Sequence, residues 1–175
     1  MSKSKTNSGK LTKSFVNKHQ GDIPVYGASK DENAVDYGYV QDNLLGIKYF
    51  ENCLTWNRNG SIGKVFYRKG RFSLSTDVIP LIVKDEYRNS VDLLYLKYAM
   101  EKELANEDFS FGNKAGKDRI KNIEIKIPTT PQDKFDLTKQ KEMAGKYQQI
   151  EEIKGKIIKE LEKIENMKAD LGIEK

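Results

Sequence analysis

The stretch KVFYRKGRFSLSTDVIPLIV, residues 64–83, decides the fold of the N-terminal part of the chain. Its apolar and polar residues alternate over short runs, which is typical of strands that bury one face. The pair Lys69-Gly70 predicts the tip of a β-hairpin between the apolar residues of 65–67 and those of 72–74. Together with IPVYGAS (23–29), these runs indicate a β-rich domain.

A helix and one more strand are predicted further along the chain. Leucines and a methionine between residues 90 and 105 follow helical spacing, and Ser90 or Asp92 can cap the start of the helix. FSFGNKAGKDR (109–119) is a Gly-rich loop. The isoleucines at 123, 125 and 127 then alternate with polar residues, which predicts a short strand that ends at Pro128.

The pattern changes after Pro131, because apolar residues now recur at steps of four and three, as in a coiled coil. About 36 residues at ~1.5 Å each give a helix of roughly 54 Å, longer than a small domain is wide, so it should project and pair elsewhere. Lys154 and Lys168 lie in the apolar seam, which favours one chosen partner helix. The residues predicted for this dimer interface are Met143, Tyr147, Ile150, Ile157, Leu161, Ile164 and Leu171.

The sequence therefore predicts two parts, a globular domain at 1–130 and a long dimerisation or spacer helix at 131–175. The net charge of +5 lies in the first part, which has 21 basic and 16 acidic residues, whereas the second has ten of each. The basic residues cluster at 1–18, 52–76 and 114–121, and such clusters favour a polyanionic partner.

Composition also narrows the compartment and the kind of site. One Cys and one His exclude a disulfide framework and the usual zinc clusters, so we expect a cytoplasmic protein without a bound metal. No run is apolar enough to span a membrane.

Two segments carry residue types suited to DNA, a hairpin at 58–71 and a loop at 112–119. Arg and Asn can bond base edges bidentately, whereas Lys and Ser mostly hold phosphates. The candidate DNA-binding residues are Arg58, Asn59, Ser61, Lys64, Lys69, Arg71, Asn113, Lys114, Lys117 and Arg119.

No catalytic constellation emerges from the sequence. GSIGK (60–64) does not fit a Walker A loop, because that loop needs a glycine at the position of Arg58 and a Ser or Thr at the position of Val65. Asp118 with Glu124 and Lys126 leaves open a small Mg²⁺-dependent nuclease, although a charged outer strand face explains these residues better. A coiled-coil adaptor that binds protein instead of DNA is the other alternative.

The order of four segments resembles the DNA specificity (S) subunit of type I restriction-modification systems. The segments are GDIPVYGAS (21–29), NGSIGKVFYRKGRFSLSTDVIPL (59–81), LLYLKYAMEKEL (93–104) with FSFGNKAGKDRIKNIEIKIP (109–128), and QKEMAGKYQQIEEIKGKIIKELEKI (140–164). The resemblance covers residues 13–170. It corresponds to a half-subunit, with one target recognition domain and one of the two helices that the family usually has.

The resemblance implies an α+β fold: a recognition domain with a twisted, largely antiparallel sheet and a few helices, followed by one long coiled-coil helix. It implies a non-catalytic subunit that reads one half of a bipartite site in double-stranded DNA. Methyltransferase and restriction subunits would be its partners, and they would use S-adenosylmethionine, ATP and Mg²⁺. Two copies pairing their helices antiparallel would rebuild the usual two-domain form as a homodimer.

Overall fold

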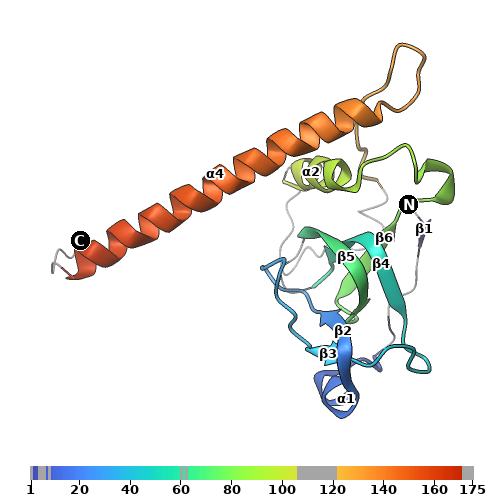
Figure 1. The fold of residues 1–175 in the computed structure, drawn as a ribbon, viewed down its shortest axis with the longest axis vertical. Helices are drawn as coiled ribbons and strands as arrows, with labels where there is room; N and C mark the ends of the chain where they lie inside the picture. The colour runs from blue at the N-terminus through green and yellow to red at the C-terminus, as the bar shows by residue number, and fades with distance from the viewer. Residues whose placement is uncertain are drawn as a thin grey trace.

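A twisted sheet forms the centre of the N-terminal part, as a computed structural model shows for residues 2–3, 7, 9–59, 61, 63–105 and 122–170 (Figure 1). Within these residues the strand order is β1-β6-β4-β5-β2-β3, and every neighbouring pair is antiparallel except β2 with β5. The strands are β1 (Ser2–Lys3), β2 (Gln20–Tyr26), β3 (Tyr39–Val40), β4 (Tyr49–Asn57), β5 (Val65–Leu74) and β6 (Val78–Ile82). The expected α+β fold with a largely antiparallel sheet is confirmed.

The prediction of a hairpin tip at Lys69-Gly70 was wrong. β5 runs without reversal from Val65 to Leu74 and pairs along its length with β4, so the hairpin turn lies before Val65. Gly70 has a positive φ of 70° because the β4–β5 register shifts here, and its N–H donates to Asn52 Oδ1 at 2.9 Å. The glycine therefore accommodates a bulge, which needs the same left-handed conformation as a tight turn.

Helix α2 (Leu93–Leu104) covers one face of the sheet. Of its two predicted caps, Ser90 and Asp92, the structure has Asp92, whose Oδ1 accepts from the Tyr95 N–H at 2.8 Å. Leu54 and Trp56 from β4 are fully buried in the cluster that α2 completes. A second cluster lies on β4, β5 and β6 around Phe72, and a third packs against the short helix α1 (Lys13–Lys18). A 3-10 turn, η1 (Asp85–Tyr87), precedes α2.

The strand predicted at 123–127 was also wrong, because these residues form no ladder within the described part of the chain. The alternation nevertheless predicted the buried side, since Ile123, Ile125 and Ile127 pack against the α2 cluster while Glu124 and Lys126 are exposed. An isolated bridge between Thr129 and Phe135 then closes a turn ahead of the last helix.

The predicted long helix is confirmed as α4 (Leu137–Asp170), which leaves the rest of the molecule as a single rod (Figure 1). Its 34 residues correspond to about 51 Å. Asp136 starts it by accepting from the Lys139 N–H at 2.8 Å. We call the described residues up to Asp136 the head; the division at residues 130 and 131 stays a prediction.

Candidate nucleic-acid interface

The connection between β4 and β5, which we call the β4–β5 turn, holds four of the candidate DNA-binding residues: Arg58, Asn59, Ser61 and Lys64. Two main-chain hydrogen bonds close it, from the Asn57 N–H to the Lys64 oxygen at 3.0 Å and from the Gly63 N–H to the Asn57 oxygen at 3.1 Å. Gly63 has a φ of 81°, a conformation that favours glycine.

Arg58 and Asn59 are both half-buried and are held by the residues that precede β6. Arg58 Nη2 donates to the main-chain oxygen of Thr76 at 3.1 Å, and its N–H donates to the Asp77 oxygen at 2.8 Å. Asn59 Nδ2 donates to Asp77 Oδ1 at 2.6 Å. The segment around the turn is free of acids in sequence, but folding brings the Asp77 carboxylate against it. Arg58 and Asn59 are thus tied to the segment before β6, and both of their side chains are already engaged in hydrogen bonds.

Ser61 and Lys64 complete the turn. The Ser61 N–H donates to the Ala28 oxygen at 3.3 Å, so the turn is also held by the segment that follows β2. Lys64 is exposed and lines an open cavity of about 670 Å³ between the head and α4, which Lys154 of α4 also lines. Of the described candidates at this turn, Lys64 has the most accessible charge.

Lys69 and Arg71 lie further along β5. Lys69 is exposed, and its Nζ lies 5.8 Å from the centre of the Tyr67 ring. Arg71 is seven residues from Lys64, or about 23 Å along a strand. It forms an ion pair with Asp42 at 2.8 Å and stacks over Tyr49 at 4.9 Å. Its hydrogen bond to Asp42 lowers the pKa of that carboxyl and raises the pKa of Arg71.

The structure therefore brings four candidates together at the turn and places Lys69 and Arg71 further along β5. The other four candidates, Asn113, Lys114, Lys117 and Arg119, lie outside the described residues, as does Asp118 of the nuclease alternative. In the described part of the chain, no group of three His, Cys, Asp or Glu side chains is arranged to hold a metal ion.

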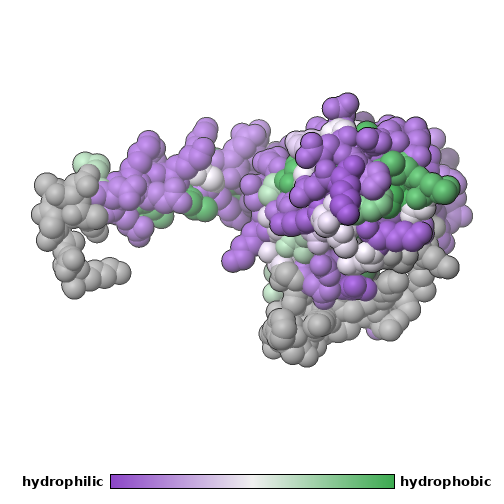
Figure 2. Space-filling model, turned by 90° about the horizontal axis from the view of Figure 1, so that it is seen from below, coloured by the Kyte–Doolittle hydropathy of each residue, from purple (hydrophilic) through white to green (hydrophobic). Residues whose placement is uncertain are grey.

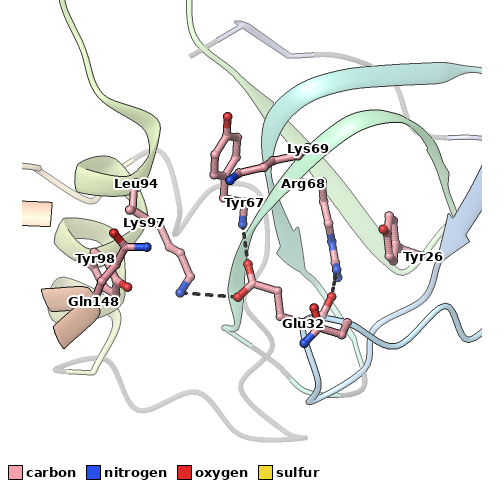
Figure 3. A pocket seen from close by; sticks show the side chains of 10 residues that line it. Tyr26, Glu32, Tyr67, Arg68, Lys69, Leu94, Lys97, Tyr98 and Gln148 are labelled. Carbon is pink, nitrogen blue, oxygen red and sulfur yellow. Dashed lines mark hydrogen bonds and ion pairs between the residues drawn. The ribbon is translucent and has the colours of Figure 1, made fainter. Parts of the chain in front are cut away.

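A polar cavity that sequence reasoning missed lies between β5, α2 and α4 (Figure 3). Its volume is about 420 Å³. Figure 3 shows Lys97 and Arg68 reaching Glu32 from α2 and β5. Lys97 Nζ lies 3.9 Å from Glu32 Oε2 and 3.8 Å from Glu101 Oε2, and Glu32 Oε1 accepts from the Tyr67 N–H at 3.0 Å.

Arg68 is the most enclosed charge of this cavity. Its guanidinium stacks on the Tyr26 ring at 3.8 Å and on the Phe66 ring at 4.8 Å, and Nη1 donates to the main-chain oxygen of Glu32. Burial lowers the pKa of Arg68, and the neighbouring Tyr26 and Glu32 oppose that shift. Burial likewise raises the pKa of Glu101, against the effect of Lys97. The Lys97–Glu32 ion pair holds the segment around Glu32 against α2, and the hydrogen bonds from Tyr67 and Arg68 hold it against β5.

The apolar seam of α4 divides into two parts. Met143 packs against the α2 cluster and Tyr147 stacks on Tyr98 of the same chain, with ring centroids 5.1 Å apart. Beyond them the seam is exposed, and Figure 2 shows hydrophobic atoms along one side of an otherwise polar rod. The apolar residues that are 46% to 63% exposed are Ile150, Ile153, Ile157, Ile158, Leu161, Ile164 and Met167. Leu171 lies outside the described residues.

The model of the type I restriction modification DNA specificity domain matches residues 3–163, which include both the head and most of α4. The chain belongs to this family. The match confirms the resemblance seen in the order of the sequence segments.

Specificity subunits of Mycoplasma pneumoniae are among the relatives of this family member. A putative type I specificity subunit is 27% identical over 121 residues, which cover 69% of this chain and 31% of the relative. A second putative subunit is 34% identical over 76 residues, covering 43% of this chain and 30% of the relative. The specificity subunit of a type I restriction enzyme is also 34% identical over 76 residues, which cover 43% of this chain and 22% of the relative. The chain thus spans less than a third of each of these relatives.

Among the residues that the structure describes, no helix combines the length and the apolar character needed to cross a membrane.

Proposed function

We propose that this chain is a non-catalytic DNA-recognition subunit of a type I restriction-modification system, in which the head reads one half of a bipartite target. The observation that carries the proposal is the family match, because it includes both the head and the projecting helix. The positive charge of the N-terminal part and the hydrogen bonds that hold the described residues of the β4–β5 turn agree with contact to a polyanion. A fixed turn loses little conformational entropy when it binds.

The second half of the target would be read by a second copy, paired through antiparallel α4 helices. The pattern of the exposed seam supports this arrangement, because it is symmetric about Ile157. Ile153 and Leu161 each lie four residues from Ile157, and Ile150 and Ile164 each lie seven residues from it. In an antiparallel pair with its two-fold axis at Ile157, each of these apolar residues therefore lies beside an apolar residue of the other helix.

Such a dimer would read an inverted repeat, with the two α4 helices fixing the distance between half-sites. A helix of about 51 Å corresponds to about 15 base pairs at ~3.4 Å each. The methyltransferase and restriction subunits are the proposed protein partners. S-adenosylmethionine, ATP and Mg²⁺ would be used by these partners, and this chain would supply no catalytic residue.

Salt dependence of binding tests the proposal against a protein-binding adaptor. The affinity of the chain for a pool of duplexes should fall steeply between low and physiological salt, because bound phosphates release counterions. Lys64→Ala should reduce the slope of log K against log salt by about 1. Lys84→Ala, which removes another exposed lysine of the head, serves as the matched control and should leave the slope unchanged. Binding that is absent or insensitive to salt would contradict the proposal.

A further inference from the structure

The start of α4 is attached to the head through Gln140, a polar residue with no exposed surface. Its Oε1 accepts from the Asp92 N–H at 2.9 Å, and its Nε2 donates to the Ser90 oxygen at 3.1 Å. Both partners are main-chain groups of the segment that leads into α2. Because the amide of Gln140 uses a donor and an acceptor at once, the side chain is fixed in direction as well as in position.

The hydrogen bond between Asp92 and Gln140 links the start of α2 to the start of α4. Asp92 donates its N–H to Gln140 and also caps α2, because Asp92 Oδ1 accepts from the Tyr95 N–H at 2.8 Å. A displacement of Gln140 would therefore disturb the first turn of α2. The orientation of α4 is in this way coupled to the helix that covers the sheet.

A second attachment lies seven residues further along α4, about 10 Å away along the helix axis. Tyr147 stacks on Tyr98 of α2 with an interplanar angle of 24°. Between the two attachments, Ala144 is buried and Met143 packs against the α2 cluster. One attachment alone would allow α4 to pivot, whereas two attachments on the same face fix its angle to the head.

From Gln148 onward, α4 has little contact with the head: its side chains up to Met167 are exposed, apart from the half-buried Gly155. The direction of the exposed part is thus determined at residues 140–147. We propose that Gln140, together with the Tyr98–Tyr147 stack, is a positioning element that sets the spacing of the two DNA half-sites without touching DNA. This inference rests on the proposed function for its consequence on DNA, but its structural part stands independently.

The structural part is tested by the distance between the head and the far end of α4. Spin labels at Ser14→Cys on α1 and Glu162→Cys on α4 occupy exposed positions, and the native Cys53 is buried. Labelled chains are diluted into unlabelled chains, so that only distances within one protomer are measured. Gln140→Met keeps the length of the side chain and removes both hydrogen bonds. Gln149→Met, at an exposed position of the same helix, is the matched control.

We expect a narrow distance distribution in the parent and in Gln149→Met, and a clearly broader one in Gln140→Met. Adding Tyr147→Leu to Gln140→Met should broaden it further. Fluorescence of the buried Trp56 confirms that each variant is folded. A distribution for Gln140→Met that matches the Gln149→Met control would overturn the inference.

The consequence for DNA is tested with half-sites and with bipartite duplexes whose spacer is changed by one or two base pairs. Gln140→Met should bind a single half-site as the parent does. The parent should prefer its own spacer by about tenfold, and Gln140→Met should lose most of this preference, because a loose joint lowers the effective concentration of the second head at its site.

The outcomes separate the two claims. A broader distribution with relaxed spacer preference supports the whole inference. A broader distribution with unchanged spacer preference refutes the role in spacing. If neither the parent nor the variant binds DNA at all, the proposed function fails, while the distance distributions still decide whether Gln140 fixes the angle of α4.

Discussion

Replacing Lys97 by Met should destabilise the head, and the loss should depend on pH. Lys97 lies on the packed face of α2, is 9% exposed, and has Glu32 at 3.9 Å and Glu101 at 3.8 Å. Met preserves most of the volume and the apolar contacts of the lysine stem. The substitution therefore removes mainly the charge that faces the two carboxylates.

The size of the effect follows from these distances. Two unit charges about 4 Å apart interact by about 4 kcal/mol at an effective dielectric constant near 20. The two carboxylate side chains are 39% and 33% exposed, so water screens much of this energy and stabilises the acids when Lys97 is absent. We therefore expect a loss of about 1–2 kcal/mol in the free energy of unfolding at pH 7.5.

The sign of the pH dependence comes from Glu101. Burial raises its pKa in the folded chain and Lys97 opposes that shift, so the pKa rises further in Lys97→Met. A carboxyl whose pKa is raised by folding destabilises the folded state when it is ionised, and this penalty disappears as the pH falls toward the unfolded pKa. The deficit of the variant should therefore be largest at pH 7.5 and smaller at pH 5.

Urea unfolding at both pH values, followed by the fluorescence of the buried Trp56, measures the effect. Lys102→Met, at an exposed position of the same helix, is the matched control. Adding Glu101→Gln to Lys97→Met should restore part of the stability lost at pH 7.5, because it removes an acid left without its partner. A loss no larger than that of Lys102→Met, or an equal loss at pH 7.5 and pH 5, would refute the reasoning.

Three further outcomes are expected. Burial raises the pKa of Cys53 to about 11, about two units above its reference value of 9.0. Iodoacetamide at pH 8 should therefore modify Cys53 about a hundredfold more slowly in the folded chain than in urea. Equal rates of modification would contradict the burial of this thiol. Ile157→Cys should form a disulfide between two copies, whereas Leu161→Cys should do so only when mixed with Ile153→Cys; efficient self-linking of Leu161→Cys would indicate parallel helices. Inserting seven residues into α4 between Gln148 and Ile157 should lengthen the spacer of the target by about six base pairs and leave the half-sites unchanged. Each of the two antiparallel helices then carries its head about 10 Å further from the two-fold axis, and a heptad keeps the apolar face in register. Methylation at the parental spacing would refute the role of α4 in setting that distance.

The elements predicted correctly from the sequence are those whose pattern is local and continuous. β6 is a continuous apolar run, α2 and α4 have helical spacing of their apolar residues, and the cap at Asp92 precedes its helix directly. β4 was missed because Glu51 and Asn52 interrupt its apolar residues at the bulge. The same bulge led to the wrong hairpin tip, since a glycine with positive φ serves a turn and a bulge equally well.

The residue types of the candidate site could be predicted from the sequence, but the contacts that these residues make in the fold could not. Arg58 and Asn59 were assigned to DNA from their chemistry, yet the hydrogen bonds to Thr76 and Asp77 depend on the path of the chain into β6. Arg68 was not singled out because its enclosure depends on Tyr26 and Glu32, which lie far earlier in the chain. Gln140 did leave a signal: it is a polar residue on the face that also carries Met143, Ala144 and Tyr147.

The methylation pattern that this chain directs tests its role in target recognition most directly. The chain is co-expressed with the methyltransferase subunit of its system, and the methylated adenines are mapped across the genome of the host. We expect methylation at one bipartite motif whose half-sites form an inverted repeat, and its loss when the chain is omitted. An asymmetric motif would contradict the homodimer, and no methylation beyond that seen without the chain would contradict the proposed role in target recognition.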